Sequence, residues 1–261
     1  MTPLNSLTHR AIRRTGFTER KDAMRFFIIL VAMAALAILL RKQIKQHPMV
    51  FYCICVAFNL LIFVNATIGL PTFMREILSV LMRRGGLGTA LFVVVMYIGA
   101  TPRASKVSRW LRPIRAELSI SACILILGHV VMYLMAYVPV LAAGRLPKDN
   151  VFASFLIAIV LLALLLALGG TSFRFVKRHM KARDWKKLQR CAYAFYALVY
   201  VHLVIMLLPA AMNGSSVAIQ NVTVYTLIFG VYLVLRLRRA ASDRKQNIDV
   251  TASIIDQGFI E

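Results

Sequence analysis

Long apolar stretches separated by short segments rich in Lys and Arg dominate the hydrophobic pattern of this chain. The apolar residues form uninterrupted blocks, whereas an amphipathic helix would repeat them every third or fourth position. A helix needs about 20 apolar residues to cross the roughly 30 Å hydrocarbon layer, and it satisfies its own backbone hydrogen bonds there. The pattern therefore predicts an all-α, polytopic transmembrane helical bundle.

Seven membrane-spanning helices are expected from these blocks. They cover residues 24–40, 49–70, 87–101, 118–143, 151–170, 191–212 and 217–235. Residues 71–86 mix apolar and charged residues at helical spacing, which favours a helix along the membrane interface that Gly85 and Gly86 would end. We divide the chain into a basic N-terminal segment with an extra helix (1–48), a six-helix membrane core (49–235) and a cytoplasmic tail (236–261).

Charge distribution orients the predicted bundle. The formal net charge of +22 would suit nucleic acid, but the Lys and Arg residues lie in short connections between apolar blocks. The positive-inside rule places such residues on the cytoplasmic side, so we expect a lipid bilayer and no nucleic acid as partner. The basic loops 101–117 and 172–190 then lie in the cytoplasm together with the C-terminus. This leaves the basic N-terminus outside, so the orientation of the first helix stays open.

Two histidines are the candidate chemistry inside the spans, His129 in the fourth and His202 in the sixth. Both spans run outward from a basic loop, and each histidine follows the first residue after the last charge, Leu118 or Cys191, by 11 residues. At 1.5 Å per residue, both imidazoles lie about 16 Å from the cytoplasmic ends. Two imidazoles at one depth on parallel helices suit axial ligation of one haem iron. The alternative is that each histidine is structural and hydrogen-bonded to a neighbouring helix.

Other polar residues in the spans say less about function than the two histidines do. The predicted boundaries leave no carboxylate deep in the membrane, which disfavours a proton- or cation-coupled transporter. Asn59, in the second span, is expected to hydrogen-bond a neighbouring helix rather than a ligand.

Four short blocks accompany the two histidines along the chain. They are RAELSI at 115–120, GH at 128–129, TS at 171–172, and WKKLQR at 185–190, which leads through Tyr193, Tyr196 and Tyr200 to His202. In these blocks, over about residues 49–235, the chain resembles the ferric reductase-like transmembrane domain family, and most closely its MsrQ-like branch of haem-binding membrane subunits. The resemblance implies a multi-pass b-type cytochrome subunit in a bacterial plasma membrane. Such a subunit would pass electrons from a cytoplasmic-side donor toward the outer face.

The resemblance also bears on the number of haems. Many family members carry a second histidine 13 residues before the one that matches His202, and here that position is Gln189. The corresponding positions before His129 are Arg115 and Ala116, again without histidine. We therefore expect one haem b, bound by His129 and His202. Tyr133 and Tyr200, each within about a turn of a histidine, are candidate neighbours of the porphyrin.

Electrons must still reach this haem from the cytoplasmic surface. One solution is FMN against the 172–190 loop, where Trp185 would stack on a ring and basic residues would hold the phosphate. Those residues are Arg174, Lys177, Arg178, Lys186 and Arg190. Basic loops with Trp are also ordinary topology anchors, which is the stronger interpretation of this loop.

No dinucleotide-binding glycine motif appears, so a separate donor is expected: a flavin, a quinol or a reductase. The acceptor would be an extracytoplasmic redox protein or ferric iron. Two further hypotheses stay open, both with structural histidines: a non-redox membrane transporter, and a membrane anchor or assembly protein.

Overall fold

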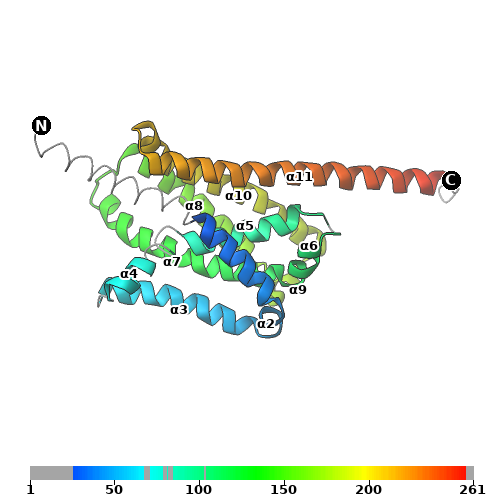
Figure 1. Ribbon diagram of the computed structural model, residues 1–261, viewed down its shortest axis with the longest axis horizontal. Helices are drawn as coiled ribbons and strands as arrows, with labels where there is room; N and C mark the ends of the chain where they lie inside the picture. The colour runs from blue at the N-terminus through cyan, green and yellow to red at the C-terminus, as the bar shows by residue number, and fades with distance from the viewer. Residues whose placement is uncertain (1–25, 68–70, 79–80, 82–84, 103, 257–261) are drawn as a thin grey trace, which may run out of the picture.

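The computed structural model describes residues 26–67, 71–78, 81, 85–102 and 104–256, and every regular element within them is helical (Figure 1). Four helices are long and apolar enough to cross a membrane, and they lie within 106–142, 149–170, 182–212 and 216–245. Three shorter apolar helices cover Phe26–Leu39, Pro48–Leu61 and Gly86–Ala100. These seven correspond one by one to the predicted spans, so the predicted helical membrane bundle is confirmed. The basic residues before residue 26 lie outside the described residues.

The labelled elements follow one another in a simple order. They are α2 (Arg41–Gln46), α3 (Pro48–Thr67), α4 (Thr72–Leu78), α5 (Gly86–Ala100), α6 (Lys106–Leu111), the 3-10 helix η2 (Arg112–Ile114), α7 (Arg115–Ala142), α8 (Asp149–Gly170), α9 (Arg174–Arg178), α10 (Ala182–Met212) and α11 (Ser216–Asp256). The predicted interfacial segment contains the short α4, and Gly85 precedes α5 as its N-cap.

Two predicted boundaries are wrong by more than a turn. Helix α10 begins at Ala182, nine residues before the predicted Cys191, so Trp185 and Arg190 lie on a helix rather than in a loop. Helix α11 continues to Asp256, so most of the predicted tail is helical. Both errors arise because hydropathy marks where a helix leaves the membrane, whereas the helix continues as long as its backbone hydrogen bonds do.

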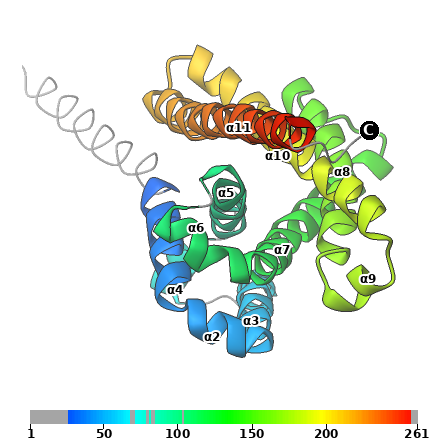
Figure 2. The same ribbon diagram turned by 90° about the vertical axis from the view of Figure 1, so that its right-hand side faces the viewer.

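Five helices form a closed ring, which is clearest when the bundle is viewed end-on (Figure 2). Helix α5 packs on α7, α7 on α8, α8 on α10, α10 on α11, and α11 returns to α5. Helices α7 and α10, which carry the two histidines, are not among the closely packed pairs, and α8 packs against both of them. Helix α3 packs on the outside of α7.

Small residues bring α7 close to its neighbours. A methyl group at Gly88 of α5 would lie 2.7 Å from Ile126 of α7, so only glycine allows this approach. On the opposite face, Gly128 leaves room for the side-chain amide of Asn59. The Asn59 amide donates a 2.6 Å hydrogen bond to the carbonyl of Ile124, which confirms the predicted interhelical role of this asparagine.

The short helices α2, α6 and α9 gather at one end of the bundle (Figure 1). We call it the basic end, because their sequences and those of the adjoining turns are rich in Lys and Arg. Helices α8 and α11 begin at the opposite end, which we call the far end.

Candidate functional site

His202 is fixed from the neighbouring helix by one residue, Ser154 of α8. Its ring atom Nδ1 lies 2.8 Å from the Ser154 hydroxyl oxygen and 3.2 Å from the Ser154 carbonyl oxygen. Ser154 is only 2% exposed, so this contact is shielded from water. A carbonyl can only accept a hydrogen bond, which favours the tautomer with the proton on Nδ1. The other ring nitrogen, Nε2, then keeps its lone pair, as a metal-ligating histidine requires.

His129 occupies a space next to the start of α5. A methyl group at Gly85 would lie 3.4 Å from the imidazole Cγ of His129, so glycine leaves room for this ring. Gly85 has a φ of +67°, a conformation that suits glycine and begins α5 beside the histidine. The ring of Tyr133, one turn along α7, packs against His129 with a centroid distance of 4.7 Å.

A row of aromatic rings extends from His129 to α8. Tyr133 stacks on Tyr137 with centroids 5.9 Å apart, and Tyr137 meets Phe155 of α8 at 6.2 Å. Phe155 directly follows Ser154, the partner of His202. We call Tyr133, Tyr137 and Phe155 the far-end aromatic row. It lines the same part of the bundle as the two histidines and offers flat apolar faces there.

The structure places the other predicted porphyrin neighbour, Tyr200, against α11. Its hydroxyl lies 2.9 Å from the Thr226 hydroxyl, and its ring centroid lies 5.2 Å from that of Phe229. Of the two tyrosines proposed from sequence, Tyr133 therefore contacts a histidine, while Tyr200 contributes to the contact between α10 and α11.

Nearer the basic end, apolar side chains fill the space between the helices of the ring. Cys123 of α7, Leu165 and Leu168 of α8, and Phe195 of α10 form a buried cluster. Phe92 of α5 joins it, with its ring centroid 5.1 Å from that of Phe195. Cys123 and Phe195 precede the histidines by six and seven residues, about 10 Å along the helices. We call this group the basic-half cluster.

Gln189 and Trp185 hold α10 to the end of α8. Gln189 Nε2 donates to the Thr171 hydroxyl at 3.2 Å, and Trp185 Nε1 donates to the Thr171 carbonyl at 3.1 Å. Lys177 Nζ lies 4.2 Å from the centroid of the Trp185 ring, so a cation covers one face proposed for flavin stacking. Arg190 is exposed to solvent. These contacts give the 185–190 block a structural role at the α8–α10 junction.

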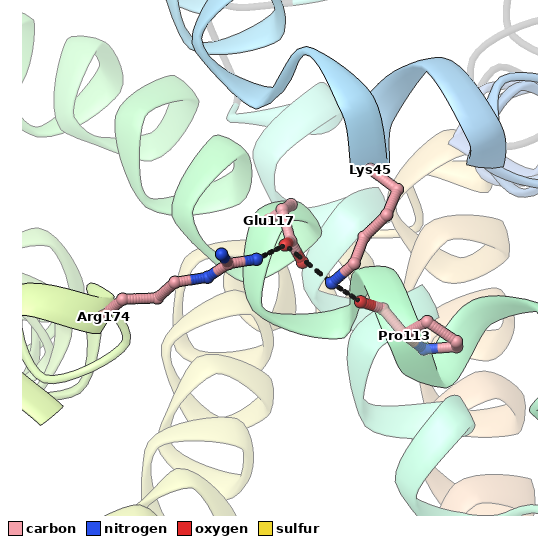
Figure 3. Close-up of polar contacts among 4 residues, drawn as sticks. All are labelled: Lys45, Pro113, Glu117 and Arg174. Atoms are coloured by element: carbon pink, nitrogen blue, oxygen red, sulfur yellow. Dashed lines mark hydrogen bonds and ion pairs between the residues drawn. The ribbon is translucent and has the colours of Figure 1, made fainter. Parts of the chain in front are cut away.

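Glu117, which the sequence analysis used only as a boundary, joins three elements at the basic end (Figure 3). Its carboxylate atom Oε1 lies 3.4 Å from Lys45 Nζ of α2 and 3.5 Å from an Arg174 guanidinium nitrogen of α9. Lys45 also donates to the Pro113 carbonyl at 2.8 Å. Glu117 is only 5% exposed. Arg174, one of the residues proposed to hold a flavin phosphate, is thus paired with a carboxylate.

The sequence analysis also missed Ser154. The available signal was a single hydroxyl in a long apolar block, but serine occurs in membrane helices for many reasons. Only the packing of α8 on α10 shows that this hydroxyl meets His202.

Comparison with known proteins gives a family match over most of the elements that carry this site. Residues 84–200 match the family model described as ferric reductase like transmembrane component. A protein of Treponema pallidum (strain Nichols), described as "Uncharacterized protein", is 34% identical over 239 residues; the alignment covers 88% of this chain and 65% of that protein's length. No solved structure matches the chain. The matched segment includes His129 and ends two residues before His202. Residues 84–200 of this chain are therefore similar to the ferric reductase like transmembrane component family.

Proposed function

We propose that this chain is a membrane electron-transfer subunit in which His129 and His202 are the axial ligands of one b-type haem. The observation that supports this most directly is the pair of contacts between His202 Nδ1 and Ser154, 2.8 Å and 3.2 Å long. Histidine ligands commonly use one ring nitrogen for the metal and the other for a hydrogen bond that fixes the ring. His129 is the matching imidazole on the opposite helix of the ring.

Each of these residues would have a separate role in binding the haem. His129 and His202 would hold the iron, and Ser154 would orient the His202 ring. The far-end aromatic row would exclude water and pack against a flat macrocycle. When bound, a haem with two imidazole ligands supplies one-electron redox chemistry without an open coordination position, which suits electron transfer rather than oxygen binding.

The basic-half cluster supports one haem rather than two. Leu165, Leu168 and Phe195 are each less than 10% exposed and pack between α7, α8 and α10. A second macrocycle would have to displace them, and Gln189 supplies no imidazole there.

Electrons would enter from the basic end and leave toward the far end of the bundle, with the C-terminus in the cytoplasm of a bacterial cell. A separate flavin, quinol or reductase would act as donor. An extracytoplasmic redox protein or ferric iron would act as acceptor. Because the chain spans 65% of the length of its T. pallidum relative, these partners are proposed for the membrane unit described here.

Absorption spectroscopy of the purified protein tests the haem assignment. Protein from cells supplied with haem should show a Soret band and a reduced-minus-oxidised α band of b type. His129→Ala and His202→Ala should each lose most of the haem. His179→Ala is the matched control, because His179 lies at the end of α9, where its Nδ1 bonds the Phe175 carbonyl at 2.7 Å.

The result that would overturn the assignment is full haem retention in both His129→Ala and His202→Ala. A wild-type protein without any chromophore, whose solute flux survives both substitutions, would instead support the transporter hypothesis with structural histidines. Loss of haem in the His179→Ala control would show that the spectroscopic effect is not specific to the two spans.

A further inference from the structure

Three arginines meet at the basic end, where α5, α7, α10 and α11 converge. Arg115 begins α7, and its guanidinium would lie 3.4 Å from a methyl group at Gly99, near the end of α5. Arg236 and Arg239 of α11 are both close enough to interact electrostatically with Arg115. Three like charges on two helices repel one another, so their convergence calls for compensating negative charge.

The structure supplies compensation for only one of them, Arg239. Its guanidinium donates to the carbonyls of Gly99 and Thr101 at 3.1 Å and 2.5 Å, which satisfies acceptors at the C-terminal end of α5. It also pairs with Asp243 at 3.6 Å. Within the described part of the chain, no carboxylate forms an ion pair with Arg115 or Arg236.

Tyr193 of α10 lies near both uncompensated arginines. The guanidinium carbon of Arg236 lies 4.9 Å above the ring of Tyr193, and Tyr193 also interacts electrostatically with Arg115. Arg115 is exposed and Tyr193 is 44% exposed, so a ligand can reach both. Arg236 is partly exposed. The Tyr193 hydroxyl adds a hydrogen-bond donor near the two charges.

A buried hydroxyl behind this cluster also lacks a partner. Tyr232, which interacts with both Arg115 and Arg236, packs edge-on against Tyr196 with a centroid distance of 4.7 Å. Tyr196 is 2% exposed, and its hydroxyl has no hydrogen-bond partner among the described residues. Buried polar groups are rarely left unpaired without a functional reason. The cluster therefore has an unused donor on its inner side as well as two unpaired cations on its outer side.

We propose that Arg115, Arg236 and Tyr193 form a binding site for a phosphate group at the basic end of the bundle. A guanidinium presents parallel N–H donors that match phosphate oxygens, and two of them with a hydroxyl suit an anion that has several oxygens and more than one negative charge. The phosphate belongs to a lipid headgroup of the adjoining leaflet or to a nucleotide such as FMN. This site lies on α7, α10 and α11, on different residues from the α9 cations considered in the sequence analysis.

Binding of FMN, riboflavin and phosphatidic acid to the full chain in neutral detergent tests the site. Equilibrium dialysis would measure the two flavins, which differ only by the phosphate, and native mass spectrometry would measure retained phosphatidic acid. The variants are Arg115→Gln and Arg236→Gln. The matched control is Arg238→Gln, an exposed arginine two residues along α11.

At least one phosphate-bearing probe should bind the wild-type chain, and inorganic phosphate should compete with it. Each of Arg115→Gln and Arg236→Gln should weaken that binding by about tenfold, because each removes a charge-assisted hydrogen bond, while Arg238→Gln should not. FMN bound more tightly than riboflavin would identify a nucleotide source, and retained phosphatidic acid alone a lipid source. Equal binding by all three variants, or no binding of any probe by the wild-type chain, would overturn the proposal.

The phosphate site and the haem assignment can each be rejected without rejecting the other. Haem content should be unchanged in Arg115→Gln and Arg236→Gln, because both residues lie near the basic end, away from the two histidines. A wild-type protein without haem would reject the proposed function but leave phosphate binding measurable.

Discussion

The two halves of the five-helix ring are built from the same helices but filled differently. In the basic half, Leu165, Leu168 and Phe195 pack against Cys123 of α7. In the far half, the same helices present two histidines, the hydroxyl of Ser154 and the far-end aromatic row. The difference shows that the bundle by itself does not specify a cofactor site. The side chains at each level determine whether the helices meet through apolar packing or through polar and aromatic groups.

The two halves also differ in the interactions that would be lost if their helices separated. Membrane helices associate through close van der Waals contact, so an apolar cluster that is already packed contributes to helix association. A polar imidazole in hydrocarbon needs a partner, and His202 obtains one from Ser154 through only one of its nitrogens. The far half therefore keeps an imidazole nitrogen that could bind a ligand, whereas the basic-half cluster offers only apolar side chains and a thiol.

The largest effect on this contrast is expected from Phe195→Ala. Phe195 is 6% exposed and contacts Phe92 across the ring, so the substitution leaves a cavity in the basic-half cluster. We expect a loss of stability of about 3 kcal/mol, measured by thermal or chemical unfolding in detergent. Phe175→Ala is the matched control, because Phe175 is 65% exposed and should change stability little. Equal stability of both variants would show that the cluster does not hold the ring together.

A smaller effect is expected from Ser154→Ala in the far half. The variant removes the hydroxyl 2.8 Å from His202 Nδ1 but keeps the backbone carbonyl as an acceptor. Loss of such a supporting contact typically weakens metal binding by about 10- to 100-fold, and we expect haem affinity at the lower end of this range. Competition for haem with apomyoglobin measures it.

The matched control for this experiment is Ser172→Ala, whose hydroxyl bonds the Leu168 carbonyl within its own chain segment at 2.7 Å. It should retain wild-type haem affinity. If Ser154→Ala also retained wild-type affinity, the Ser154 hydroxyl would have no part in orienting the ligand.

The smallest effect, an unchanged haem number, is expected when histidines are introduced in the basic half. Ala116→His combined with Gln189→His restores imidazoles at the positions where many family members carry them. Because Phe195 and its neighbours fill this half, and position 189 faces Thr171 of α8, we expect haem content to stay at one per chain. Pyridine haemochrome assay against protein concentration measures it. Two haems per chain would show that ligands, rather than packing, limit the number.

How far the sequence predicts this molecule depends on the range of the interactions involved. The predicted spans follow from local hydrophobicity: an apolar helix was found at all seven places, and four of these helices are long enough to cross a membrane. The hydrogen bond from Asn59 to a neighbouring helix was predicted, although not its acceptor, because an amide in lipid must find an acceptor on another helix. The early start of α10 and the extension of α11 were missed, because charged residues continue a helix in water without any hydrophobic signal.

The site shows the same division. His129 and His202 stand out in the sequence because an imidazole is costly in a membrane. The protein partners of the other site residues could not be predicted in this way: the Tyr200 hydroxyl lies beside that of Thr226, and Trp185 donates to the Thr171 carbonyl. The direction of a side chain around a helix depends on which helix packs there, and this is a property of the whole bundle.

The sequence by itself determined that the chain is a helical membrane protein, which end of the bundle is basic, and which two histidines lie within the spans. Each of these depends on the transfer of individual residues between water and lipid, a property of local composition. Only the tertiary structure decided that α7 and α10 lie on opposite sides of a ring, that Ser154 reaches His202, and that Arg115 meets two arginines from α11. Those outcomes depend on how helices distant in sequence pack, and close approach of small residues such as Gly88 selects among the possible arrangements.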